Sequence, residues 1–153
     1  MRTSKSIAVR IILTSLSALM IGFIFLNSAL DAPTSSVHSS AVLEFINSML
    51  AKIGTTITLT ENFVRKCAHF VEYSLLGTLI LFAMYSYDLK AKKSAFATLI
   101  SGFSVAFIDE CIQLFSQGRS AQFSDVMLDF SGVCFSVAII LFIYKLLRKV
   151  RKY

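Results

Sequence analysis

Most of the side chains that could do chemistry gather in one short segment. From Arg65 the sequence reads R-K-C-A-H-F-V-E-Y, so His69 and Glu72 follow the arginine by four and seven residues. This spacing places these side chains, and that of Tyr73, on one face of a helix. A histidine near a carboxylate can transfer protons or help to hold a divalent cation. Arg65 and Lys66 could instead bind a phosphate or a carboxylate.

Two further polar groups follow in otherwise apolar sequence, and both repeat at helical spacing. Asp109 and Gln113 are one turn apart, and so are Asp125 and Asp129, whose stripe continues to Gly132. A glycine on such a stripe lets a neighbouring helix approach closely. The complete set of candidate site residues is Arg65, Lys66, His69, Glu72, Tyr73, Asp109, Glu110, Gln113, Arg119, Asp125 and Asp129.

The composition indicates what kind of element positions these groups. Of the 153 residues, 56% are hydrophobic and only 16% are charged, and the mean hydropathy is +0.71. Soluble domains are roughly 45–50% apolar, and about a quarter of their residues are charged. A disordered chain would need low hydrophobicity. The composition therefore excludes both a soluble globule and a disordered segment.

Four windows are long and apolar enough for helices that cross a bilayer, which need roughly 20 such residues. They cover residues 7–30, 63–87, 94–115 and 124–147. We therefore predict an all-α integral membrane protein, a single domain over residues 1–153 built as a four-transmembrane-helix bundle. The first window follows basic residues, as in a signal peptide, but its apolar stretch exceeds the usual length of about 7–15 residues. An uncleaved helix is favoured.

The distribution of lysine and arginine predicts the orientation, because cytoplasmic loops carry an excess of both. Eleven lie on the side of the two termini and four on the other side. We expect a multi-pass protein of the plasma membrane with both termini cytoplasmic. The net charge of +6 then reflects topology, and no basic domain remains that could bind nucleic acid. The eleven are Arg2, Lys5, Arg10, Lys90, Lys92, Lys93, Lys145, Arg148, Lys149, Arg151 and Lys152, and the four are Lys52, Arg65, Lys66 and Arg119.

The external loop, residues 31–62, should have structure of its own. Hydrophobic residues recur at helical spacing from Val42 to Ile53 and are opposed by polar residues such as Asn47. This pattern predicts an amphipathic helix that lies at the outer membrane surface or caps the bundle. The alternating T-T-I-T-L-T that follows suits a short extended segment or a hairpin. His38 lies in the serine-rich start of the loop and is expected to be an ordinary surface residue.

The connection between the third and fourth windows is short. Gly118 can adopt the left-handed conformation that ends a helix, and Ser124 or Asp125 can cap the next one.

The three cysteines, Cys67, Cys111 and Cys134, all fall in apolar windows. Their number is odd, and none belongs to a C-x-x-C motif or lies near a second histidine. A disulfide framework and a zinc site are therefore not expected. We predict small buried residues within helices.

The charged candidates within the windows lie toward the outer ends of those windows, and Arg119 lies in the outer connection between the third and fourth windows. A charged side chain at the membrane centre costs a few kcal/mol, and such residues therefore face the interior of a helix bundle. Since the polar stripes of the second, third and fourth windows lie at one depth, we expect them to face one another. Five carboxylates and three cationic side chains give this site a charge of −2, or −1 with His69 protonated. Such a site could be internally paired, share a proton, hold one divalent cation or bind an anionic group. The alternative is a set of interfacial charges and structural ion pairs.

The order and spacing of these residues resemble the VanZ-like family of small bacterial membrane proteins. The resemblance covers residues 62–140 and is specific, because two separate motifs agree. It departs from the family pattern at Asp129, where Asn is common, and at Ser136, where Gly is common, which allows a different ligand. The first motif is R-K-x-A-H-F-x-E-Y from Arg65, and the second combines Asp109-Glu110, Gln113, Phe115, Gly118-Arg119, Asp125-Val126 and Asp129.

The resemblance implies a compact helical membrane domain. The namesake of the family is associated with resistance to teicoplanin, a lipoglycopeptide that targets cell-wall precursors. No defined chemical reaction comes with the resemblance.

Two classes of function remain open. The first is a non-catalytic protein that binds an anionic or amphiphilic cell-envelope ligand at the outer leaflet, such as a lipid-linked phosphate, a cell-wall precursor or a lipoglycopeptide. Arg65, Lys66 and Arg119 would then contact anionic groups. The second is a membrane enzyme that acts on a lipid-linked phosphate or cell-wall precursor, with His69 as general acid or base.

Binding is favoured over catalysis, since the chain contains neither H-E-x-x-H nor G-x-S-x-G. Proton-linked transport is disfavoured because four helices offer no inverted repeat. No cofactor is expected, although one histidine with several carboxylates would suit Mg²⁺ or Mn²⁺. Beyond the lipid bilayer itself, the sequence leaves the ligand and the oligomeric state open.

Overall fold

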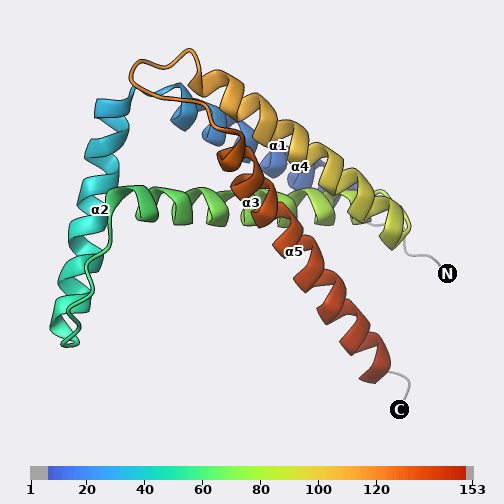
Figure 1. The fold of residues 1–153 in the computed structure, drawn as a ribbon. Coiled ribbons are helices and arrows are strands. Elements are labelled where there is room, and N and C mark those ends of the chain that lie inside the picture. The colour runs from blue at the N-terminus through green and yellow to red at the C-terminus, as the bar shows by residue number, and fades with distance from the viewer. Residues whose placement is uncertain (1–6, 151–153) are drawn as a thin grey trace.

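The computed structural model describes residues 7–150, which form five helices (Figure 1). Four of them are long and apolar enough to cross a membrane, and no strand occurs among the described residues. The predicted all-α fold with four spans is therefore confirmed. Four of the basic residues used to predict the orientation, Arg2, Lys5, Arg151 and Lys152, lie outside the described residues. The helices are α1 (Ile7–Ala29), α2 (Ala32–Lys52), α3 (Glu61–Ser86), α4 (Ala91–Gln113) and α5 (Phe123–Val150).

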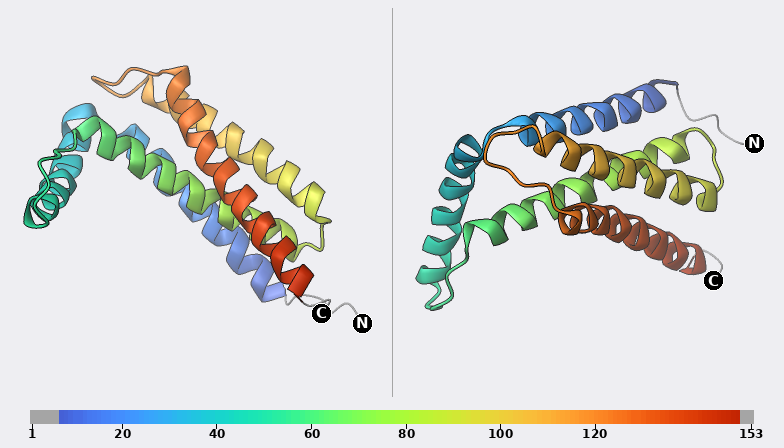
Figure 2. Two further views of the ribbon diagram at one scale, coloured as in Figure 1. Left: turned by 60° about the horizontal axis from the view of Figure 1, so that its bottom comes forward. Right: turned by 45° about the horizontal axis from the view of Figure 1, so that its top comes forward.

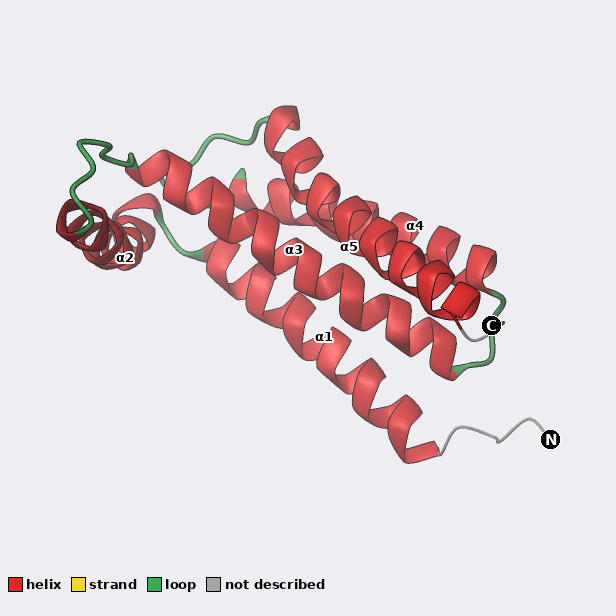
Figure 3. Cartoon of the chain, turned by 90° about the horizontal axis from the view of Figure 1, so that it is seen from below, coloured by secondary structure: helices red, strands yellow, loops and turns green. Residues whose placement is uncertain are grey.

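α3 is the central helix of the bundle and packs against α1, α4 and α5. The start of α1, the α3–α4 turn and the end of α5 lie at one end of the bundle, as Figures 2 and 3 show. The α1–α2 corner and the α4–α5 loop lie at the other end. α2 leaves the bundle crosswise and contacts chiefly α3 (Figure 1).

A close contact between α3 and α5 depends on Gly132. A Cβ atom at this position of α5 would lie 2.5 Å from the carbonyl oxygen of Phe70 in α3. The Ser74 hydroxyl donates to the Gly132 carbonyl at 3.1 Å, which fixes the two helices in register. The polar stripe from Asp125 to Gly132 therefore faces α3, and the close approach expected from the sequence is present.

A polar contact at the opposite end fixes α1 along α3. The Arg10 guanidinium donates to the Ser86 carbonyl at 2.9 Å and pairs with Asp88 at 3.0 Å. It also lies over the Tyr87 ring, 5.5 Å from the ring centre. These contacts set the height of α1, and with it the position of Asn27 and Ser28 near the polar site.

α2 begins at Ala32, ten residues before the periodic pattern that predicted it. Asp31 caps the helix by accepting the Thr34 N–H at 3.2 Å, and Pro33 lies in the first turn. Hydrogen bonding from Thr34 lowers the pKa of Asp31. The prediction of a serine-rich loop was wrong, because this cap starts a helix that includes residue 38. The side chain of His38 lies outside the described part of the chain.

The segment 55–60 is extended but forms neither a strand nor a hairpin. Asn47 of α2 holds it by pairing with both backbone groups of Leu59: the Leu59 N–H donates to Asn47 Oδ1 at 2.9 Å, and Asn47 Nδ2 donates to the Leu59 carbonyl at 3.4 Å. Asn47 was expected on the polar face of the amphipathic helix. It is half-buried instead, and it replaces the partner strand that a hairpin would provide.

The α4–α5 loop differs from its prediction in its capping. Gly118 has a φ of 76° but lies in the middle of the loop, because α4 already ends at Gln113. α5 begins at Phe123, so Ser124 and Asp125 belong to its first turn and cap nothing.

The three cysteines are free, as expected, and lie in helices. Cys111 and Cys134 are half-buried, but Cys67 is exposed, so the prediction of burial was wrong for Cys67. Cys67 lies beside the α2–α3 contact on the outside of the bundle, where α3 has no other helix against it.

Candidate functional site

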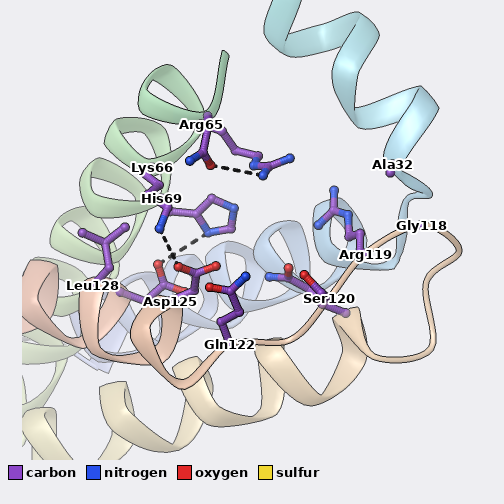
Figure 4. A pocket seen from close by; sticks show the side chains of 13 residues that line it. Ala32, Arg65, Lys66, His69, Gly118, Arg119, Ser120, Gln122, Asp125 and Leu128 are labelled. Atoms are coloured by element: carbon purple, nitrogen blue, oxygen red, sulfur yellow. Dashed lines mark hydrogen bonds and ion pairs between the residues drawn. The ribbon is translucent and has the colours of Figure 1, made fainter. Parts of the chain in front are cut away.

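A polar cavity of about 180 Å³ lies at the end of the bundle that carries α2 (Figure 4). Its walls come from the first turns of α3 and α5, the end of α4, the α4–α5 loop and the start of α2. Seven of the eleven predicted site residues line it, and the first and last of them, Arg65 and Asp129, are 64 positions apart in the sequence. The seven are Arg65, Lys66, His69, Gln113, Arg119, Asp125 and Asp129.

His69 and Asp129 form the polar floor of this cavity. His69 Nδ1 lies 3.6 Å from Asp129 Oδ1, and the Asp129 side chain is only 2% exposed. Asp109 approaches the same pair from α4 and is completely buried. One donor atom from each of the three residues lies within 4.8 Å of the others. The site therefore joins α3, α4 and α5 at one point.

These three residues have the donor types that a divalent cation requires. Two carboxylates and one imidazole, with water completing the shell, suit Mg²⁺ or Mn²⁺ better than a structural zinc ion. Gln113 Nε2 donates to the second oxygen of Asp109 at 3.4 Å, which orients that carboxylate.

Tyr73 lies below the floor and is completely buried. Its hydroxyl is close enough to the Asp109 and Asp129 carboxylates to interact with both. Tyr73 lines neither cavity described here. Its place in the core indicates that it supports the floor from below.

Lys66 and Asp125 form an ion pair at the edge of the cavity. Lys66 Nζ lies 2.8 Å from Asp125 Oδ1, and both side chains are partly exposed. The pair joins the first turns of α3 and α5. Because the charge of Lys66 is neutralised by Asp125, this lysine contributes little net positive charge to the cavity.

Arg65 and Arg119 carry the unneutralised positive charge. Among the described residues, neither has a carboxylate within ion-pair distance. Arg65 donates to Asn62 Oδ1 at 3.4 Å, and Arg119 donates to the Asn27 carbonyl at 3.3 Å. The Nε of Arg119 is buried and has no hydrogen-bond partner within the described part of the chain. Partial burial, reinforced by the neighbouring Arg65 charge, lowers the pKa of Arg119.

Glu110 lies behind the α4–α5 loop and lines neither cavity. Its Oε1 accepts the backbone N–H of Gln122 at 2.5 Å, while its Oε2 is buried and has no partner among residues 7–150 as described. Glu110 thus positions the loop that carries Arg119 and does not face the cavity itself.

A second, mostly apolar cavity of about 410 Å³ adjoins the first between α1, α2 and α3. The two cavities share three lining residues, Arg65, His69 and Arg119. Glu72, the remaining predicted site residue, lines this apolar cavity and not the polar one. The other lining residues are Phe23, Asn27, Leu30, Ser39, Val42, Val64 and Ala68.

Sequence reasoning missed the contribution of α1. Ser28 is 1% exposed, and its carbonyl accepts the Ser116 hydroxyl at 2.8 Å, while the Asn27 carbonyl accepts Arg119. Asn27 and Ser28 stand out in the sequence as two polar residues at the end of an otherwise apolar window. Their contacts here are made by backbone carbonyl groups, however, and since every residue has one, the sequence does not show that these two would be used.

A family model described as VanZ/LLP1 matches residues 13–146. The chain belongs to the VanZ/LLP1 family. The VanZ/LLP1 match extends from α1 to α5 and includes every residue that lines the two cavities. No match was found among curated proteins, and none among solved structures.

Proposed function

We propose that this VanZ/LLP1 protein binds an anionic amphiphile of the cell envelope at the outer leaflet of the plasma membrane. The observation that carries the proposal is the pair Arg65 and Arg119, two guanidinium groups without a carboxylate partner that line both the polar and the apolar cavity. Guanidinium groups bind phosphate and carboxylate in bidentate geometry. An anionic head group between them would relieve their mutual repulsion.

The location of the cavities suits a ligand that is part of the membrane. They lie at the end of the bundle opposite the α3–α4 turn with Lys90, Lys92 and Lys93, and the excess of basic residues at that opposite end supports a cytoplasmic location for it. The cavities would then face the outer leaflet. Lipid-linked phosphates and cell-wall precursors combine an anionic group with a hydrocarbon chain at this depth.

A contribution to resistance against teicoplanin-type antibiotics belongs to the same proposal. A lipoglycopeptide also joins ionic groups to an acyl chain and acts on cell-wall precursors at the outer leaflet. Expression in a teicoplanin-susceptible bacterium should raise the inhibitory concentration, and Arg65→Gln with Arg119→Gln should remove the increase. An unchanged inhibitory concentration would restrict the ligand to lipid-linked phosphates.

The direct test measures thermal unfolding of purified protein in a non-ionic detergent while dodecyl phosphate is added. A ligand at one hundred times its Kd stabilises the folded state by about 2.7 kcal/mol. We expect stabilisation of the wild type and none of the Arg65→Gln, Arg119→Gln variant. Arg148→Gln, an exposed arginine near the opposite end of α5, is the matched control and should respond like the wild type. The proposal would be contradicted if the cationic dodecyltrimethylammonium stabilised the wild type as much as dodecyl phosphate does. It would also be contradicted if dodecyl phosphate stabilised the Arg65→Gln, Arg119→Gln variant as much as the Arg148→Gln control.

The geometry of His69 supports a second candidate, an enzyme acting on a lipid-linked phosphate or cell-wall precursor. A carboxylate beside Nδ1 favours the tautomer in which Nε2 can accept a proton. His69 lines the polar cavity with Asp129 behind it, which is the arrangement of a general base with an orienting carboxylate.

His69→Gln separates the two candidates. A binding protein should keep most of its response to dodecyl phosphate in this variant, whereas an enzyme should lose turnover of a polyprenyl phosphate followed by mass spectrometry. Stoichiometric Mg²⁺, Mn²⁺ or Zn²⁺ in the purified wild type, lost in His69→Gln, would also favour the enzyme.

A further inference from the structure

We infer that the bound amphiphile is a lipid-linked phosphate of the outer leaflet whose hydrocarbon chain lies between α2 and α3. The inference rests on the proposed function and names the class of ligand and its path. The seat of the chain is an apolar groove, called here the chain groove, of about 460 Å³. Its main lining residues are Val42, Ile46, Phe63, Val64, Ala68 and Val71.

The chain groove continues the two cavities of the site. The polar cavity shares Arg65 and Arg119 with the apolar cavity, and the apolar cavity shares Val42, Val64 and Ala68 with the chain groove. A continuous path therefore leads from the two guanidinium groups to the outside of α3. Ligand sites are typically about 300–1,000 Å³ in volume, and the apolar cavity and the chain groove each fall within this range.

The lining of this path changes from polar to apolar, as an amphiphile does from its head group to its hydrocarbon chain. The polar cavity is lined mostly by charged and amide side chains, the apolar cavity keeps the two arginines beside Phe23 and Leu30, and the chain groove has one charged lining residue, Glu72. Phosphate oxygens would lie at the arginines, and methylene groups would lie against aliphatic side chains.

Glu72 determines which end of the path the phosphate can occupy. Its carboxylate lies where the apolar cavity meets the chain groove, about two helical turns beyond Arg65. A negative charge at this point repels a phosphate that moves further toward the groove. It acts as a repulsive element that favours one placement of the ligand over another.

The chain groove contributes by fixing where the hydrocarbon chain lies, and not by a gain in hydrophobic free energy. Lipid tails are as apolar as the side chains of the groove, so a chain gains little by leaving the bilayer. α2 stands crosswise beside the start of α3, as Figures 1 and 2 show, and it supplies one wall of the groove. The wall holds the chain so that its head group stays at Arg65.

The experiment uses photo-crosslinking in phosphatidylcholine nanodiscs. One sample contains phosphatidic acid with a diazirine in its acyl chain, and the other contains phosphatidylcholine with the same acyl chain. Peptide mass spectrometry maps the adducts. Ala68→Trp fills the chain groove, together with the adjoining part of the apolar cavity, from an exposed position. Val71→Trp fills the chain groove alone, also from an exposed position. Leu75→Trp is the control, on the same helix, exposed and outside every cavity named here.

We expect phosphatidic acid adducts to concentrate on α2 and α3, and Ala68→Trp to reduce them about tenfold, equivalent to ~1.4 kcal/mol. Leu75→Trp should leave them unchanged. Adducts spread evenly over all outward helix faces, or unaffected by Ala68→Trp, would overturn the inference. Should Ala68→Trp fail to fold, Val71→Trp blocks the same groove from an exposed position and gives the same expectation.

The head group is tested separately from the chain. Equal labelling by phosphatidic acid and phosphatidylcholine, unchanged in Arg65→Gln with Arg119→Gln, would overturn the proposed anion site. If phosphatidic acid is labelled more strongly than phosphatidylcholine but Ala68→Trp does not reduce the adducts, the anion site would be supported and the chain groove would be rejected as the place of the hydrocarbon chain.

Discussion

Three carboxylates of the site are almost completely removed from water, and each is held differently. Asp129 faces His69, Asp109 accepts from Gln113, and Glu110 accepts from the backbone of the α4–α5 loop. A buried polar atom without a partner costs about 1–3 kcal/mol. The second oxygen of Glu110 is such an atom, so this residue is the clearest place where a neutral side chain would fit at least as well.

Glu110→Gln should therefore keep or raise the stability of the fold. The glutamine carbonyl can still accept the Gln122 N–H, and the neutral amide removes a buried negative charge that lies near the Asp109, Asp125 and Asp129 carboxylates. Thermal unfolding in detergent measures the effect. Glu44→Gln, at an exposed position of α2, is the control and should change stability by less than about 0.5 kcal/mol. A clear loss of stability in Glu110→Gln would show that the charge is needed.

The sequence predicts that Arg65, Lys66 and Arg119 share one site, but it cannot predict which charge is paired. Successive residues on a helix point about 100° apart, since a turn holds about 3.6 residues. Lys66 consequently reaches Asp125 while Arg65 faces Arg119. This difference depends on how α3 is rotated against α5, and that rotation is set by packing in the core.

At the scale of elements, the contact of α3 with α5 determines whether the site residues meet. At Gly132 the two backbones lie close together, and this glycine is one turn beyond Asp129. Any side chain there pushes α5 away from Phe70, and His69 precedes Phe70 directly. Stability and site geometry are thus coupled through one residue.

Gly132→Ala should destabilise the protein, because its methyl group would meet a backbone carbonyl that cannot move away easily. Overpacking of this kind costs typically about 1–3 kcal/mol. Gly22→Ala in α1 is the matched control, since nothing lies within 4 Å of the position. It should be neutral or should stabilise by up to about 1 kcal/mol through helix propensity. Chemical denaturation in detergent compares the two, and equal effects would contradict the packing argument.

The ends of the four spanning helices lie within three residues of their predicted positions. Apolar length and flanking charges determine them, and both can be read from the sequence. The start of α2 could not be predicted in this way. It depends on the Asp31 cap and on a hydrogen bond from the Ala32 N–H to the Gln117 carbonyl at 3.0 Å, which joins segments far apart in the chain.

At the scale of the whole molecule, the start of α1 and the end of α5 lie at one end of the bundle, and the α1–α2 corner and the α4–α5 loop lie at the other (Figure 3). Residues of this second end line both cavities. Four spans require this arrangement, but they do not decide which end faces the cytoplasm. The excess of basic residues favours the proposed orientation, in which both termini are cytoplasmic.

Cysteine labelling in intact cells tests this orientation. In a variant without Cys67, Cys111 and Cys134, single cysteines at Ser36 and Gln122 should react with an impermeant thiol reagent, and one at Lys92 should not.

A membrane-permeant reagent is the control and should label all three positions. Labelling of the Lys92 position alone by the impermeant reagent would reverse the orientation and place both cavities on the cytoplasmic side.

The crosswise course of α2 has a mechanical consequence. In the proposed orientation α2 lies in the outer headgroup layer, and helices in that layer respond to lipid packing and curvature. It is fastened at its start to the α4–α5 loop and in its second half, through Asn47, to the segment that leads into α3. Tension in the outer leaflet would therefore pull on one wall of the chain groove. Occupancy of the site should follow lateral pressure in the membrane as well as ligand concentration.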